Sequence, residues 1–129
     1  MPLAFVETTK AHGTSSAAPV PIPELSLALP EGAGEQALVI LNLPNVYVMK
    51  ATGGDPGGAM FHILVNGTAL RAYALINPTP TNATNKGQQT VTLVVAVPLK
   101  FEAQTITATW QTTNGFTVVA ETASLSARS

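Results

Sequence analysis

Titratable side chains, the groups on which most enzymes depend, are few and scattered in this sequence. The chain has one aspartate, Asp55, six glutamates, two histidines and no cysteine. Acid–base or nucleophilic catalysis needs such groups to converge in one cleft. No serine stands in the strand–turn–helix context of a nucleophile elbow. The sequence therefore predicts a protein that is not an enzyme.

Metal sites are also not expected. Calcium prefers several carboxylates around one ion, whereas the segment GGDPGG offers only Asp55 and is better interpreted as a turn. Zinc sites are built from cysteine and histidine, but His12 and His62 are distant and no cysteine is present. His62 is interpreted as a packed or half-exposed residue of a strand, and His12 has no partner nearby in sequence. We predict no cofactor.

Neutral polar side chains are concentrated in one long connection, INPTPTNATNKGQQT, residues 76–90. It exceeds the two to five residues of an ordinary hairpin loop, and Lys86 is its single charge. Asparagine, glutamine and threonine offer donors and acceptors without charge, which suits hydroxyl-rich ligands such as sugars. From the residues alone, a loop that is polar only because it faces water remains an open alternative.

The elements that must position these loops are predicted to be strands, because the helical period is absent and Val, Ile and Thr are frequent. Alternating Pro19, Pro21 and Pro23 exclude a central strand and indicate an extended edge segment or a connector. Asn66-Gly67 and Asn114-Gly115 predict hairpin turns. The expected strands are residues 3–8, 25–29, 36–44, 59–65, 68–76, 89–99 and 105–111 and a closing segment 116–127. Residues 30–35 and 45–58 are predicted loops.

This pattern predicts an all-β sandwich or jelly roll of about eight to ten antiparallel strands. We expect one domain over residues 1–129, since the length suits a single core. No run approaches the length of a membrane span. The N-terminus shows no standard secretory signal, so the protein is expected to be cytoplasmic or exported by another route.

Charged residues make up only 10% of the chain, and the net charge is -1. Binding to nucleic acid or to an anionic membrane needs concentrated positive charge, so neither partner is expected. Low charge has two interpretations. The surface is rich in uncharged polar residues, or much of it is buried against other copies of the chain. The second interpretation predicts a homo-oligomer.

Four segments together resemble a known family: VILNLPNVY, GGDPGGAMFHILVNG, TLVVAVPL and ATWQTTNGFTVVAETASLSA. Their order and spacing are similar to those of the small bacterial TNF-like lectins, a family that includes a fucose-binding N-terminal domain of a bacterial superlectin. The resemblance covers residues 36–127. It implies a TNF/C1q-like jelly roll, a homotrimer, and calcium-independent glycan binding in sites shared between protomers.

The same resemblance places the sugar site on seven positions of this chain: Tyr47, Met60, Asn77, Asn85, Lys86, Gln88 and Asn114. Tyr47 keeps the tyrosine of the family. Gln88 and Asn114 stand where the family has two arginines that grip sugar hydroxyls. An amide side chain lacks the charge and the planar fork of donors of arginine. We therefore expect a specificity altered from fucose. The alternative is a trimeric TNF/C1q-like structural or protein-binding module that has lost sugar binding.

Overall fold

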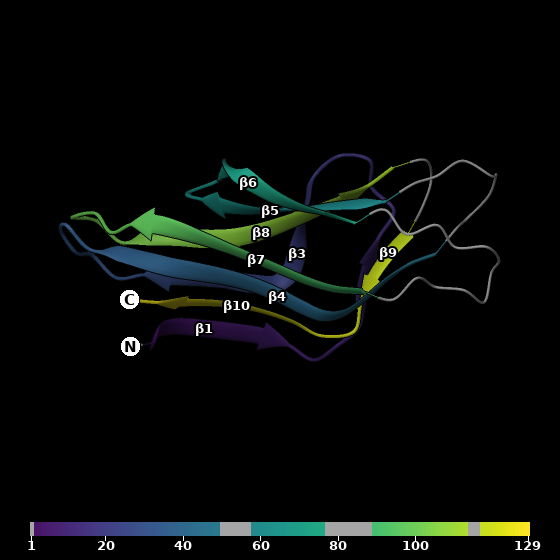
Figure 1. Ribbon diagram of the computed structural model, residues 1–129, viewed down its shortest axis with the longest axis horizontal. Coiled ribbons are helices and arrows are strands. Elements are labelled where there is room, and N and C mark those ends of the chain that lie inside the picture. The colour runs from purple at the N-terminus through teal and green to yellow at the C-terminus, as the bar shows by residue number, and fades with distance from the viewer. Residues whose placement is uncertain (1, 50–57, 77–88, 114–116) are drawn as a thin grey trace.

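Ten β-strands and no helix make up the residues that the computed structural model describes, which are 2–49, 58–76, 89–113 and 117–129 (Figure 1). The strands are β1 (Pro2–Thr8), β2 (His12–Thr14), β3 (Val20–Leu29), β4 (Gln36–Met49), β5 (Ala59–Val65), β6 (Thr68–Ile76), β7 (Gln89–Pro98), β8 (Gln104–Thr112), β9 (Thr117–Ala120) and β10 (Ala123–Arg128). This confirms the predicted all-β class.

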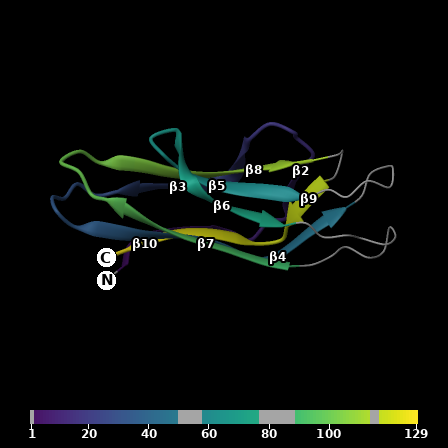
Figure 2. The ribbon, with the colours of Figure 1, turned by 45° about the horizontal axis from the view of Figure 1, so that its top comes forward.

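Two antiparallel sheets lie face to face (Figure 2). The first, sheet A, has the order β1-β10-β4-β9-β2, and β7 pairs with the other edge of β4. The second, sheet B, has the order β3-β8-β5-β6. At the sides of the sandwich β1 contacts β3 and β6 contacts β7. Most neighbours within a sheet are distant in sequence, and this arrangement agrees with the predicted jelly roll.

The core lies between the sheets because the long strands alternate buried apolar residues with more exposed outward residues. In β7, Val91, Leu93, Val95 and Val97 are buried, and the residues between them are exposed. In β8, Ile106, Ala108 and Trp110 are all buried. The rings of Trp110 and Phe61 lie 6.4 Å apart between centroids and are tilted by 56°, an arrangement that aromatic pairs favour.

The proline segment is part of an edge strand. We expected a strand to begin at residue 25, but β3 begins at Val20 and includes Pro21 and Pro23. Proline is tolerated here because β3 is the edge of sheet B and its register with β8 shifts between Pro21 and Ser26. The expectation of an extended edge segment was thus correct, and the boundary was wrong.

Strand β4 is longer than predicted, since residues 45–49 were expected to be a loop. Instead β4 continues to Met49 after a bulge between Leu43 and Val46 in its register with β7. The continuation pairs with β9, where Tyr47 lies opposite Val119. Long-range pairing of Val46 and Val48, both fully buried, outweighs the turn-like Pro-Asn that precedes them.

The hairpin predicted at Asn66-Gly67 is confirmed. Its φ angles are 50° at Asn66 and 83° at Gly67, and two central residues with positive φ are the mark of a type I′ turn. The second hairpin, Asn114-Gly115, lies outside the described residues. The closing segment forms two strands, β9 and β10. The short strand β2, which was not predicted, pairs with β9.

Candidate functional site

Tyr47 lies on the outer face of sheet A, in the part of β4 that pairs with β9. Its neighbours Val46 and Val48 are fully buried, so alternation turns the half-buried Tyr47 outward. The bulge before Val46 sets this orientation, because an inserted residue changes which side chains face the core. The retained tyrosine of the family pattern is therefore at the surface.

A shallow polar hollow of about 260 Å³ lies at this bulge, lined by Pro44, Asn45, Gln89 and Thr90. The Thr90 hydroxyl donates a hydrogen bond to the carbonyl of Pro44 at 2.9 Å. The side-chain amide of Asn45 donates to the carboxylate of Glu121 at 2.7 Å. The backbone N–H of Glu121 donates to the carbonyl of Asn45 at 3.3 Å. These bonds fix the hollow between three segments of chain.

This bulge hollow is lined by two amide side chains, those of Asn45 and Gln89, and by the Thr90 hydroxyl, and the Asn45 amide is held by the carboxylate of Glu121. Such groups donate and accept hydrogen bonds to hydroxyls, and a tyrosine ring nearby can pack against the apolar face of a sugar ring. Asn45, Thr90 and Glu121 were missed in the sequence, where nothing marks them as neighbours. The bulge in β4 and the β9–β10 connection bring them together.

Met60 lies on the outer face of the other sheet. In β5 the neighbours Ala59 and Phe61 are buried, and the half-buried Met60 pairs with Leu75 and Gln111 across sheet B. Tyr47 and Met60 therefore face outward from opposite layers of the sandwich, and one copy of the chain does not bring them together. The other predicted site residues, Asn77, Asn85, Lys86, Gln88 and Asn114, lie outside the described residues.

A second polar cluster joins β1, β2 and β3. The Thr8 hydroxyl donates to Oε2 of Glu24 at 2.5 Å, and Nε2 of His12 lies 3.1 Å from the Thr8 hydroxyl and 3.4 Å from the same carboxylate oxygen. The hydrogen bond from Thr8, then that of His12, lowers the pKa of Glu24. His12 thus has partners in the fold, contrary to the expectation from its sequence neighbours.

This cluster does not have the order of a catalytic triad. Thr8 and His12 both reach one oxygen of Glu24, so the histidine does not stand between the hydroxyl and the carboxylate as a relay base would. Within the described ranges, no three histidine, cysteine, aspartate or glutamate side chains gather as a metal site would require. Nor does this part of the chain contain a helix long and apolar enough to cross a membrane.

The fold and this surface together define the class of protein. It is an antiparallel jelly-roll sandwich with neutral polar groups beside a tyrosine that faces outward. Residues 9–128 match the family model of the Bc2l-C N-terminal domain, and the chain belongs to this family. This match confirms the membership in the TNF-like lectin family that the four sequence segments predicted.

One solved structure similar to this chain is dimeric latent PorU from Porphyromonas gingivalis, with a TM-score of 0.55 and 12% identity. The similarity covers 96% of this chain but only 12% of the PorU chain. At such low identity the likeness shows the fold alone. No curated protein matches the chain.

Proposed function

We propose that this protein is a lectin that binds neutral glycans at Tyr47 and the bulge hollow, without calcium and in a homotrimer. The observation that carries the proposal is the outward Tyr47 beside a hollow of uncharged donors and acceptors, in a chain of a lectin family. Sugars present hydroxyls and apolar ring faces together, and this surface offers a partner for each. The proposal includes no catalytic activity.

Sites completed by a second copy are supported by the placement of Tyr47 and Met60. The two residues face outward from different sheets, so a glycan can contact both only where sheet A of one protomer meets sheet B of its partner. A contact between two different faces is heterologous, and it closes into a ring when the rotation between copies allows it. A trimer is the ring that the family resemblance implies.

Apolar side chains on both outer faces support the same arrangement. Phe5, Ser126, Ile40 and Val94 form one row across sheet A, from β1 to β7. Phe5 is 62% exposed and Val94 is 51% exposed. On sheet B the exposed Tyr73 and Leu75 lie beside Met60 and His62. Joining the two faces would bury both apolar sets, which stabilises association.

An altered specificity is supported by the uncharged character of the bulge hollow. Charge-assisted hydrogen bonds are roughly twice as strong as neutral ones, and the two family arginines are replaced by Gln88 and Asn114. A site that relies on amides and hydroxyls is expected to bind more weakly than one with arginines. It is also expected to accept a neutral glycan other than fucose.

The test is a broad glycan array, followed by calorimetry with the best glycan and with a fucoside, on wild-type protein and on Tyr47→Ala and Tyr47→Phe. Tyr47→Ala should weaken binding at least about tenfold, because a packed aromatic ring contributes more than 1.4 kcal/mol. Tyr47→Phe keeps the ring and should bind more tightly than Tyr47→Ala.

Folding of each variant is checked by circular dichroism. A folded wild-type protein that binds no glycan on the array would refute the lectin proposal and favour the protein-binding module. Binding that is unchanged in Tyr47→Ala would place the site elsewhere. Binding abolished by a calcium chelator would refute the calcium-independent part alone.

A further inference from the structure

A second hollow lies at the end of the sandwich far from β9, between the turn that precedes β4 and the turn that joins β7 to β8 (Figure 1). This end hollow has a volume of about 510 Å³. It is lined by Gly32, Ala33, Gly34, Leu99, Lys100, Phe101 and Glu102. Along β4 it is on the order of 35 Å from Tyr47, at the rise of an extended strand. The proposed function does not use it.

The two turns are fixed to each other. The N–H of Gly32 donates to the carbonyl of Lys100 at 2.7 Å, and the N–H of Leu99 donates to the carbonyl of Glu35 at 3.0 Å. A Cβ at position 32 would lie 2.6 Å from Oε2 of Glu35 and 3.0 Å from Cδ1 of Leu99. A side chain at position 32 would have to displace Glu35 and Leu99, and the two backbone hydrogen bonds hold the turns together on their own.

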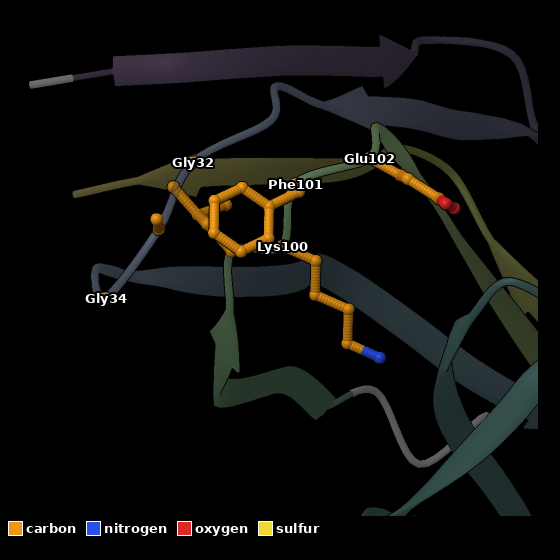
Figure 3. Close-up of a pocket in the computed structure, with 7 residues that line it drawn as sticks. Gly32, Gly34, Lys100, Phe101 and Glu102 are labelled. Atoms are coloured by element: carbon orange, nitrogen blue, oxygen red, sulfur yellow. The ribbon is translucent and has the colours of Figure 1, made fainter.

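Phe101 is the main apolar surface of the end hollow, with 82% of its area exposed. Its ring lies on the side of Gly32, whereas the charged ends of Lys100 and Glu102 are turned away from that turn (Figure 3). An exposed phenylalanine on a fixed turn has no role in the core. It offers a flat apolar face to the end hollow.

The charge around the hollow limits the ligand. Residues 30–35 and 99–103 carry Glu31, Glu35 and Glu102 against Lys100, three negative groups and one positive. Such a surface repels phosphates, nucleic acid and anionic lipid headgroups. A volume of this size suits a ligand of one or two rings. A neutral, hydroxyl-rich ring with an apolar face satisfies both limits.

We propose that the end hollow is a second carbohydrate subsite, in which the apolar face of one neutral pyranose stacks on Phe101. The subsite stands independently of the site at Tyr47. If both bind, one molecule holds glycans at opposite ends of the sandwich and bridges two glycan-bearing surfaces. That bridging role rests on the proposed function, whereas the subsite itself does not.

The experiment is an amide NMR titration of the full chain with the methyl glycosides of galactose, glucose, mannose and fucose, each added separately at millimolar concentration. At least one glycoside should give saturable shifts at the amides of Gly32, Gly34 and Phe101. Phe101→Ala should weaken that binding about tenfold or more, since it removes the stacking face. Phe101→Trp should preserve it.

Tyr47→Ala is the matched control, because it removes an aromatic ring at the other end and should leave the shifts of the end hollow unchanged. This separates failure of the subsite from failure of the proposed function. The absence of saturable shifts at these amides with all four glycosides would overturn the proposal. Equal binding by Phe101→Ala would also overturn it. So would sedimentation showing that Phe101→Ala only removes contact between copies of the chain.

Discussion

At the scale of single residues, Glu24 is the residue whose conformation its sequence explains least. Its φ of 67° is in the left-handed region, which glutamate rarely adopts. The carboxylate is held by Thr8 and His12, from β1 and β2. Glu24 stands where the register of β3 shifts. The network therefore ties the N-terminal strands of both sheets at an irregular point of β3.

The lowered pKa of Glu24 predicts a pH dependence of stability. A carboxyl whose pKa is lower in the folded state stabilises the fold above its ordinary pKa of 4.5, and this contribution is lost as the pH falls through the lower folded pKa. Glu24→Gln should lower the free energy of unfolding at neutral pH, and its difference from wild type should shrink in acid. Denaturant unfolding from about pH 7 to about pH 3 measures this.

The control for this prediction is Glu31→Gln, an exposed glutamate of the turn before β4. It should leave the free energy of unfolding nearly unchanged across the pH range. A Glu24→Gln difference that stays constant down to the lowest pH would contradict the linkage, because a purely structural contact does not titrate.

At the scale of elements, the β5–β6 hairpin is specified by residues that are adjacent in sequence, whereas the length of strand β4 is specified by pairing with distant strands. The hairpin has its turn type specified by two adjacent residues, Asn66 and Gly67, both at positive φ. The Asn66 side-chain oxygen also accepts a hydrogen bond from the N–H of Thr105 at 2.9 Å. Strand β4 extends past Pro44 because distant segments pair with it there: Val46 lies opposite Ala120 of β9 and Gln89 of β7.

Substitution of Gly67 measures the free-energy cost of the left-handed turn backbone separately from any steric clash. A Cβ at this position meets nothing within 4 Å, while φ is 83°. Gly67→Ala should therefore destabilise the fold by about 1 kcal/mol through the left-handed backbone only. Gly67→Asn should cost less, because asparagine tolerates this region. Thermal and denaturant unfolding of both variants gives the comparison. Equal stability of Gly67→Ala and wild type would contradict the type I′ assignment.

At the scale of the whole molecule, both outer faces carry exposed apolar side chains. One face presents the row from Phe5 to Val94, and the other presents Tyr73 and Leu75. Between them the two ends hold different hollows, one polar and one centred on Phe101. Faces are thus suited to contact between copies, and ends to ligands.

Val94 tests the proposed trimer. Val94→Glu places a charge at the β7 end of the row that begins at Phe5, where burial against a partner would leave it unpaired. Each contact should lose about 1.5–3 kcal/mol of hydrophobic free energy, apart from the cost of the charge. We expect wild type to sediment as a trimer and the variant as a monomer at micromolar concentration.

Thr105→Glu, on the outer face of β8 and away from both apolar sets, is the control and should remain trimeric. Circular dichroism should show all three proteins folded, since Val94 points away from the core. A wild-type protein that sediments as a monomer would remove the shared site from the proposal. A trimeric Val94→Glu would place the interface on another surface.

The parts of the candidate site that depend on residues close together in sequence were predictable, and the parts that depend on distant residues were not. Tyr47 was identified from a short motif, and its outward direction follows from alternation with Val46 and Val48. The bulge hollow was not predictable, because Asn45 and Glu121 meet only when β4 pairs with β9. The same holds for His12, whose partner Glu24 lies on the other sheet. The prediction of one domain over residues 1–129 remains a prediction.

The sequence by itself determined the strand class and the Asn66-Gly67 turn. These depend on backbone preferences and on a two-residue alternation, which neighbouring residues specify. Only the tertiary structure decided that Pro21 and Pro23 belong to an edge strand, that β4 continues to Met49 and that two hollows lie at opposite ends. Each depends on which strands pair although they are far apart in sequence. Burial of the whole core determines this pairing, and no single segment specifies it.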